Sequence, residues 1–499
     1  MWKRAGDRAR RQPALTASEA EPAALQYRGF AILVIRGRRA RLGGRMTDAV
    51  PEDFVTAPAP IAPVGPAAAR ATPYSKAYTR YAMVLMLGIY AVNYIDRQII
   101  NILGEPIKHD LKLSDGQLGL LGGLAFAVLY TFLGIPIARL AETGNRPRII
   151  SIAAVTWSGF TLLCAAAGNF WQILLFRVGV GVGEAGCAAP SHSLVVDYHP
   201  MEKRASALAF YSLGSPIGTA AGLVMGGLVF DAYGWRAAFV VAGLPGLLFG
   251  VVAFFTLREP RRLLARQAAA ATATAVSFGQ TLAHLFKRRT FWLVGAGATL
   301  INAPGSTFTA SFFLRNHAAE VARLAQGLGV KPLGFLGLAI GLTHVAGALG
   351  VWSSGWLTDR YGVRDLRNYT IAPAIAALLA IPVRLAQFTV ESTWVALALL
   401  AVSTFLGALW WGPVFSVGQS VVPPRMRATS AAILIFMIVF IGSFGGLGVG
   451  VLSDYFNHGL GMGLAEGVRW ALLAVTGVWP LAFACFWLAR RTIREDFVG

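Results

Sequence analysis

The chain has 499 residues, of which 56% are hydrophobic and only 14% are charged, and its formal charge at pH 7 is +20. Soluble domains contain about 45–50% apolar and about 25% charged residues, so this composition excludes a soluble globular protein and indicates an integral membrane protein. The positive charge does not indicate nucleic-acid binding, because it lies largely in loops and tails where anionic membrane lipids attract it.

The first 73 residues are rich in Ala, Pro and Arg, and we predict that they form a disordered cytoplasmic tail. Their one apolar run, FAILVI at 30–35, is too short to cross a bilayer. Residues 1–45 also fit a gene-start artefact, because the composition changes abruptly toward acids at Met46. An Arg-rich targeting peptide is the alternative.

Apolar runs of about 20 residues follow, each long enough to cross a hydrocarbon core of about 30 Å. They lie near 81–103, 117–138, 148–167, 171–195, 205–230, 236–257, 290–314, 333–357, 368–386, 393–418, 428–452 and 468–489. A basic cytoplasmic linker at 259–289 divides them into two sets of six. We therefore predict an all-α membrane protein with twelve transmembrane helices in two six-helix lobes, at 74–258 and 290–491, and a cytoplasmic tail at 492–499.

Matching signals recur in the two halves and indicate duplication. The pairs are ARLAETGNR (138–146) with GWLTDRYGVR (355–364), KRASA (203–207) with MRATS (426–430), and the ladder Gly214, Gly218, Gly222 and Gly226 with Gly442, Gly446 and Gly450. A four-residue glycine spacing keeps one helix face free of side chains, so a neighbouring helix can approach closely. We expect both ladders at the seam between the lobes, around a central cavity.

The short loops predicted on the same side as the N-terminus carry most of the loop Arg and Lys residues. These are Arg139, Arg146, Arg148, Lys203, Arg204, Arg360, Arg364, Arg367, Arg425 and Arg427. By the positive-inside rule both termini are cytoplasmic, as expected for a multi-pass protein of a bacterial inner membrane.

Four ionisable residues lie inside apolar spans: Asp96 and Arg97 in the first, and Arg177 and Glu184 in the fourth. Such side chains cost several kcal/mol in a bilayer unless they are paired or face water, so by default they mark an ion, proton or substrate path. A fixed ion-pair network that only holds helices together is the alternative.

Depth estimates place the four charges relative to one another. Asp96 lies about 24 Å from the cytoplasmic end of its helix and Arg177 about 12 Å from the outer face, so the two are level and can pair. Glu184 shares a face with Arg177 but lies about 10 Å closer to the cytoplasm, too far for a direct salt bridge. We expect Asp96 and Arg177 to form a protonation switch, Glu184 to be a second proton site near the midplane, and Arg97 to be structural.

Several polar or aromatic residues are candidate cavity contacts. Pro and Gly in NAPGSTFT (302–309) break the seventh span, and broken helices expose backbone toward cavities. The candidates are Asn302, Ser306 and Thr307 from this break, Asn93 and Tyr94 beside Asp96, His344 in the eighth span and Trp410 in the tenth. A packing kink, an interior hydrogen-bonded histidine and a bulky core residue are the respective alternatives for the break, His344 and Trp410.

The loop after the second span of each half is a candidate cytoplasmic gate. In the second half Asp359, Arg360 and Arg364 can form a charge latch, next to Gly355 at the helix end. The first-half counterparts are Glu142 and Arg146. Retention of the loop on the cytoplasmic side is the simpler role of these basic residues.

These motifs resemble a known family. GWLTDRYGVR resembles the loop signature of the major facilitator superfamily, and Gly234-Trp235-Arg236 resembles its sixth-helix opening. NYIDR (93–97) and FRVGVGVGEA (176–185) resemble the spinster branch, whose animal members export sphingosine phosphate or lysophospholipids. The resemblance covers about residues 74–491, and the first-half loop departs from the signature at Ala138, Glu142 and Thr143.

The resemblance implies a monomeric, proton-coupled secondary transporter that moves an amphipathic or anionic organic solute by alternating access. Protonation of Asp96, and of Glu184, would free Arg177 to bind the anionic group. Multidrug or metabolite efflux, uncoupled facilitation and a membrane sensor without transport are the alternatives. We expect no cofactor beyond the proton gradient, no metal and no enzyme activity, because HExxH, nucleophile-elbow and P-loop motifs are lacking and the three cysteines have no metal-ligand spacing.

Overall fold

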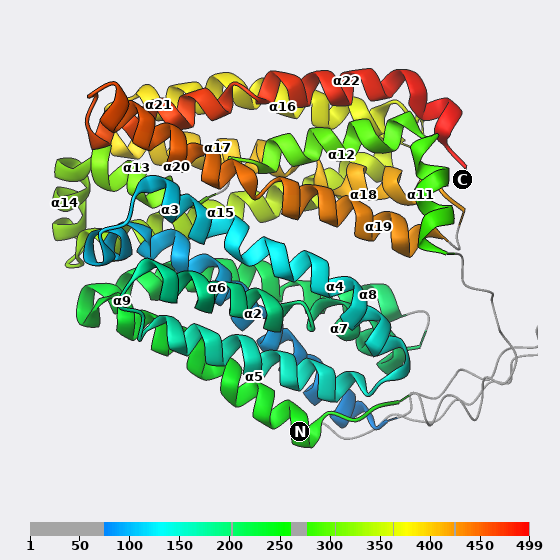
Figure 1. Ribbon diagram of the computed structural model, residues 1–499. Coiled ribbons are helices and arrows are strands. Elements are labelled where there is room, and N and C mark those ends of the chain that lie inside the picture. The colour runs from blue at the N-terminus through cyan, green and yellow to red at the C-terminus, as the bar shows by residue number, and fades with distance from the viewer. Residues whose placement is uncertain are drawn as a thin grey trace, which may run out of the picture. The chain divides into compact units, whose positions relative to one another are not determined.

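The computed structural model describes residues 74–200, 203–260, 277–304, 306–362, 364–423 and 426–498. All regular secondary structure in these ranges is helical (Figure 1). Residues 68–499 belong to one compact unit. The tail predicted at 1–73 and most of the linker predicted at 259–289 lie outside the described residues.

The first half of the fold runs from α2 to α9. Its elements are α2 (Lys76–Leu111), α3 (Asp115–Gly119), the π-helical turn η2 (Leu120–Leu124), α4 (Ala125–Thr143), α5 (Arg146–Cys164), α6 (Phe170–Glu184), α7 (Ala188–Tyr198), α8 (Arg204–Ser212) and α9 (Gly214–Thr256).

The second half runs from α11 to α22, and in Figure 1 most of its helices form the upper group. Its elements are α11 (Phe278–Phe286), α12 (Arg289–Asn302), α13 (Thr309–Asn316), α14 (Ala318–Gly327), α15 (Pro332–Leu357), η4 (Thr358–Gly362), α16 (Asn368–Thr389), α17 (Thr393–Ala408), α18 (Trp411–Ser420), α19 (Arg427–Ile435), η6 (Phe436–Ile441), α20 (Phe444–Asp454), η7 (Tyr455–Gly459), α21 (Leu464–Thr476) and α22 (Trp479–Asp496).

Among the described residues, 10 helices are long and apolar enough to cross a membrane. One of them, Ser206–Thr256, has 51 residues and contains two spans, since the chain bends at Gly234, where φ is 82°. The seventh predicted span is divided between α12 and α13, each too short to qualify by itself. Counting these, the structure accounts for all twelve predicted spans.

Side-chain caps set the start of the helices that carry the first-half site. The Asn145 side chain accepts a hydrogen bond from the Arg148 N–H at the start of α5, and Asn169 caps α6 in the same way. Ser114 and Gln117 form a capping box at α3. Each cap satisfies N–H groups that a helix start leaves without a partner, so these polar residues determine where each helix begins.

The two glycine ladders have different partners. In α20 a side chain at Gly450 would come within 2.1 Å of the Asp115 carbonyl oxygen, and one at Gly446 would lie 3.5 Å from the Gly119 carbonyl oxygen, so these two glycines face the first half, as predicted. A side chain at Gly442 would instead meet Ile438 and Asn302 of the second half. In α9 a side chain at Gly218 would come within 2.1 Å of the Ala91 carbonyl oxygen on α2, which belongs to the same half. The expectation that the first ladder lines the seam is therefore wrong for Gly218, because α9 reaches α15 with another face, which carries Leu223 and Gly227.

Close packing of α9 on α2 predicts a stability effect for Gly222→Ala. A methyl group there would meet the Ile95 main chain at 3.0 Å, and overpacking of this kind costs about 1–3 kcal/mol. Thermal melting of the purified protein should show a lower transition for this variant. The matched control is Gly159→Ala on α5, where nothing lies within 4 Å and removal of a mid-helix glycine stabilises by about 0.5–1 kcal/mol. Equal melting of the two variants would contradict the close contact.

Candidate functional site

A buried ion pair joins α2 to α6. The Arg97 Nε donates to the Glu184 Oε2 at 2.6 Å. The Glu184 side chain is 0% exposed and the Arg97 side chain 22% exposed. At this depth the two charges stabilise each other, and neither can be removed without leaving the other unpaired.

Three aromatic rings surround the guanidinium of this pair. The Arg97 Cζ lies 5.2 Å from the ring centre of Tyr94, and 4.7 Å from each of the ring centres of Phe126 and Tyr130. Cation–π contacts of this kind are worth about 0.5–2 kcal/mol each and use none of the N–H donors. Arg97 is thus held in place even when its hydrogen bonds change.

The pair corrects one expectation drawn from the sequence. Glu184 is not alone, and the acid that lies within bonding distance of Arg97 is Glu184 and not the adjacent Asp96. A bond between α2 and α6 agrees with the structural role expected of Arg97. Rotation about a helix axis relates only residues of the same helix. It therefore does not predict that a long Arg side chain on α2 contacts a residue on α6. Asn93, 2% exposed, neighbours the Glu184 carboxylate.

Asp96 and Arg177 are neighbours, as their estimated depths predict, but they do not form a carboxylate–guanidinium pair. The Arg177 Nη1 donates instead to the Asp96 main-chain oxygen at 3.1 Å. Both carboxylate oxygens of Asp96 are buried and accept no hydrogen bond from the described residues. The Thr161 hydroxyl and the Trp157 indole, which also have no partner, are the polar groups beside this carboxylate. A buried carboxyl with no donor is easier to accommodate when it carries a proton.

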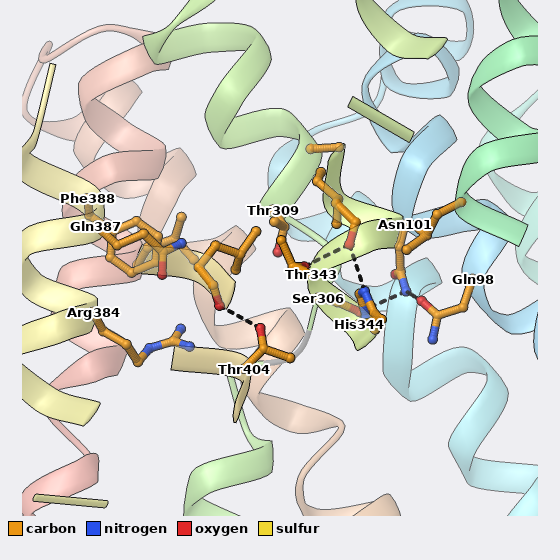
Figure 2. Close-up of a pocket in the computed structure, with 15 residues that line it drawn as sticks. Gln98, Asn101, Ser306, Thr309, Thr343, His344, Arg384, Gln387, Phe388 and Thr404 are labelled. Carbon is orange, nitrogen blue, oxygen red and sulfur yellow. Dashed lines mark hydrogen bonds between the residues drawn. The ribbon is translucent and has the colours of Figure 1, made fainter. Parts of the chain in front are cut away.

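Two cavities lie between the halves and share Ser306 and Arg384. Cavity A has a volume of about 170 Å³ and is lined by Gln98, Asn101, Leu223, Ser306, Thr309, Ala310, Ile340, Thr343, His344, Arg384, Gln387, Phe388, Leu400, Thr404 and Leu472 (Figure 2). Cavity B has a volume of about 360 Å³ and is lined by Gly122, Gly123, Phe126, Ala127, Ile301, Asn302, Ala303, Pro304, Ser306, Thr307, Arg384, Val439, Gly442, Ser443 and Gly446. Phe126 also packs against the Arg97 guanidinium, so one side chain is shared by the lining of cavity B and the surroundings of the ion pair.

The predicted break in the seventh span lies at the cavities. Asn302 ends α12, and the three residues expected as contacts, Asn302, Ser306 and Thr307, all line cavity B. Ser306 also accepts a hydrogen bond from the Asn101 Nδ2 at 2.8 Å, which connects the break to α2.

The other expected contacts divide between cavity and core. His344 lines cavity A, with its Nδ1 3.0 Å from the Ile340 carbonyl oxygen. Trp410 lines neither cavity: it is 2% exposed, belongs to a hydrophobic cluster and stacks on Trp411 with ring centres 4.9 Å apart. The expected role of Trp410 as a cavity wall is therefore wrong, since its side chain packs into the interior of the second half.

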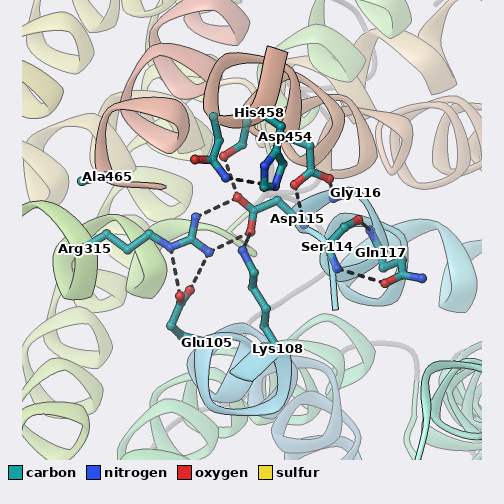
Figure 3. Close-up of polar contacts among 12 residues, drawn as sticks. Glu105, Lys108, Ser114, Asp115, Gly116, Gln117, Arg315, Asp454, His458 and Ala465 are labelled. Atoms are coloured by element: carbon teal, nitrogen blue, oxygen red, sulfur yellow. Dashed lines mark hydrogen bonds and ion pairs between the residues drawn. The ribbon is translucent and has the colours of Figure 1, made fainter. Parts of the chain in front are cut away.

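A polar cluster that the sequence did not predict ties the halves together at one end. Arg315 on α13 donates to both carboxylate oxygens of Glu105, at 2.8 and 3.0 Å, and to both of Asp115, at 2.7 and 2.8 Å (Figure 3). The Arg315 side chain is 6% exposed and the Asp115 side chain 0%. Four charge-assisted bonds from one guanidinium make this a strong contact.

Further bonds from α20 complete this cluster, which we call the Asp115 latch. Asp454 accepts hydrogen bonds from the Asp115 and Gly116 N–H groups at 2.9 and 2.7 Å, and the Ser453 hydroxyl donates to Asp115 at 2.6 Å. Lys108 adds a bond to the same carboxylate at 2.5 Å. A weak signal was present in the sequence, because Leu-Ser-Asp occurs at both 113–115 and 452–454.

The opposite end of the fold carries the loops expected to be the gate. Arg146 is fully buried and bonds Asp197 and Ser193 of the first half and Glu259, the first residue of the predicted linker. The Glu142 side chain lies outside the described residues. Arg146 therefore fastens the first half to itself and to the start of the linker.

In the second-half loop, Asp359 and Arg360 are exposed, and Asp359 forms no ion pair with the rest of the described chain. Arg360 and Arg364 face the rings of Trp356 and Tyr361, at 5.6 and 5.8 Å, while Gly355 borders open space. The predicted latch of Asp359, Arg360 and Arg364 is thus not formed in this conformation.

Nearby, in the loop that leads to α16, the Arg367 main-chain N–H and the Arg494 guanidinium lower the pKa of Asp365 below its usual value. This carboxylate is exposed enough that it adds little to stability.

Comparisons with known proteins agree with these features. The family model described as Major Facilitator Superfamily matches residues 86–447. The chain is 31% identical to an MFS-type efflux pump of Mycolicibacterium smegmatis, over 85% of this chain and 95% of that protein. It is 26% identical to a probable L-galactonate transporter of Escherichia coli, over 75% of this chain and 83% of that protein.

A solved structure is also similar. It is the crystal structure of a bacterial homolog to the human lysosomal transporter spinster, in an inward-facing and unoccupied conformation. Its TM-score is 0.74 at 29% identity, and the match covers 85% of this chain and 100% of that chain.

Proposed function

Since the chain belongs to the Major Facilitator Superfamily, we propose that it is a proton-coupled secondary transporter that moves an amphipathic or anionic organic solute by alternating access. Membership makes it a multi-pass membrane transporter of small molecules and not an enzyme. Proton coupling and the nature of the solute go beyond membership, and the buried charges of the first half support them.

The single observation that carries proton coupling is the pair of carboxylates buried beside guanidinium groups. Glu184 holds Arg97, and Asp96 lies next to Arg177 without a hydrogen bond to its carboxylate. A proton on Glu184 would remove the charge that holds Arg97 and leave that guanidinium available for a solute anion at cavity B. Proton uptake and anion binding would then occur together, and Asp96 would serve as a second proton site.

The Asp115 latch supports alternating access. From the positive-inside rule we propose that this end lies on the outer side and that both termini are cytoplasmic, in a chain of a bacterial inner membrane. A conformation latched outside, in which Asp359 and Arg360 form no ion pair with the described residues at the inner end, would be an inward-facing one. Loss of the latch and closure of the inner loops would give the outward-facing state. The proposed unit is a monomer that needs no cofactor beyond the proton gradient.

The name of one similar protein supports an anionic solute. It is a probable L-galactonate transporter, and L-galactonate is a carboxylate with hydroxyl groups. Efflux of drugs or metabolites is the second candidate, favoured by the similarity to the efflux pump.

Transport by the purified protein in liposomes tests the proposal. The panel consists of lysophospholipids, sphingoid phosphates and organic acids, each with and without an imposed pH gradient. Asp96→Asn should lower gradient-driven uptake at least about tenfold, because the site loses a proton carrier, while solute exchange without a gradient remains. Asp110→Asn is the matched control, since this acid ends the same helix and its side chain is 45% exposed. Uptake that ignores the gradient would rule out coupling and leave the transporter assignment intact.

A further inference from the structure

Arg384 is a cation in the interior of the second half. It lies 16 residues after Asn368, where α16 begins, which is about 24 Å along the helix axis. No carboxylate pairs with Arg384 within the described part of the chain.

Aromatic side chains hold Arg384 without using its hydrogen-bond donors. Its Cζ lies 5.5 Å from the ring centre of Phe388 and 4.9 Å from that of Trp479. Its buried Nε has no hydrogen-bond partner among the described residues. A guanidinium has five N–H donors, and a half-buried cation with donors free is costly unless a ligand or water fills them. The arrangement orients the planar guanidinium group and leaves its N–H donors available to a ligand.

The free donors face the cavities. Arg384 is one of two residues that line both cavity A and cavity B, and Figure 2 shows it extending from α16 in the direction of Thr404. Cavity B also reaches Phe126, whose other neighbour is Arg97. A solute in these cavities therefore meets Arg384 directly, whereas Arg97 lines neither cavity and contacts only the Phe126 ring of cavity B.

The rest of cavity A offers acceptors for hydroxyl groups. The Asn101 Oδ1 is buried and has no hydrogen-bond partner in the described chain. The His344 Nδ1 faces the Ile340 carbonyl oxygen, which assigns the proton to Nδ1 and leaves Nε2 as an acceptor. In Figure 2 both residues lie away from Arg384, with Thr309 and Thr343 between them. The lining thus combines one anion-binding group with acceptors at a distance from it.

We propose that Arg384 is an anion-binding residue of these cavities, in addition to Arg97, and holds the carboxylate or phosphate of a hydroxylated organic anion, whose hydroxyl groups bond Asn101 and His344. The proposal rests on the proposed transport function and specifies its substrate class. A planar fork suits the two oxygens of such an anion, and a charge-assisted bidentate contact gives both affinity and orientation. A soluble hydroxy acid and the headgroup of a lysolipid share this chemistry.

Binding measured without any gradient tests the proposal separately from proton coupling. The purified chain in lipid nanodiscs is titrated calorimetrically with D-gluconate, with 1-oleoyl lysophosphatidate, and with sorbitol as the uncharged analogue of gluconate. Arg384→Met should weaken binding of the preferred anion about tenfold to a hundredfold, and Arg384→Lys should weaken it less. Binding of gluconate alone identifies a soluble acid, and binding of lysophosphatidate alone identifies a lipid headgroup.

Two controls keep the result specific. Arg323→Met removes a cation whose side chain is 76% exposed on α14 and should leave binding unchanged. Without ligand, Arg384→Met should melt at or above the wild-type temperature, because it removes a cation that lacks a buried counter-charge, whereas loss of a structural contact would lower the melting temperature. Unchanged anion affinity in Arg384→Met, or failure of both anions to bind the wild-type chain more tightly than sorbitol, would overturn the proposal.

Discussion

Accumulation of solute against its gradient is expected to be lost in the Glu184→Gln variant, while solute exchange persists. Glutamine imitates the protonated acid, so Arg97 has no counter-charge that a proton could remove. Loss of one partner of a buried ion pair costs about 3–5 kcal/mol, and we expect a lower melting temperature to accompany the loss of coupling. Uptake into liposomes and thermal melting measure the two effects.

The pH dependence of anion binding gives the sharper test of the same pair. In the wild-type chain binding should strengthen as the pH falls, because a proton on Glu184 releases Arg97. In Glu184→Gln it should be strong and nearly independent of pH. The double variant Arg97→Gln with Glu184→Gln should recover much of the melting temperature but not the accumulation, because it removes both buried charges. A Glu184→Gln variant that still concentrates the solute with wild-type pH dependence would refute the proposed coupling.

Arg315→Gln is expected to open the Asp115 latch. Arg315 makes four bonds to Glu105 and Asp115, and its loss leaves two acids with Lys108 as their remaining cation. Breaking a buried ion pair costs about 3–5 kcal/mol. The population of molecules with a closed latch should therefore fall at least about a hundredfold relative to the population with an open latch.

Distances between spin labels measure this change. The label sites are Lys112 and His458, both exposed and close in the chain to Asp115 and Asp454. Cys485 is replaced in the labelled chain, since the other two cysteines are buried. Arg315→Gln should broaden the distance distribution toward longer values. Arg323→Gln is the control, because its i,i+3 pair with Glu320 is exposed and worth about 0–1 kcal/mol. Identical distributions for the wild type and Arg315→Gln would contradict the latch.

Features that depend on a single stretch of chain could be predicted from the sequence. The twelve spans, the break after Asn302 and the internal repeat follow from hydropathy, Pro and Gly positions and spacing. The membrane class and the superfamily follow from the same patterns and agree with the match over residues 86–447. The four ionisable residues within two of the spans can also be identified in the sequence.

The partner of each charged residue could not be predicted from the sequence, because it depends on which helices face each other and how far a side chain reaches. Asp96 and Arg177 were expected to pair, yet Arg177 bonds the Asp96 main chain. The acid bound by Arg97 belongs to a different helix.

By itself the sequence determined the spans, the duplication, the family and the residues that place charge in the membrane, since each is a property of consecutive residues. Only the tertiary structure decided that Arg97 bonds Glu184, that Arg384 lies beside the cavities without an acid partner among the described residues, and that Arg315 closes the Asp115 latch. The physical reason is that an ion pair requires its atoms within about 4 Å, and helix packing alone brings residues so distant in the chain that close together.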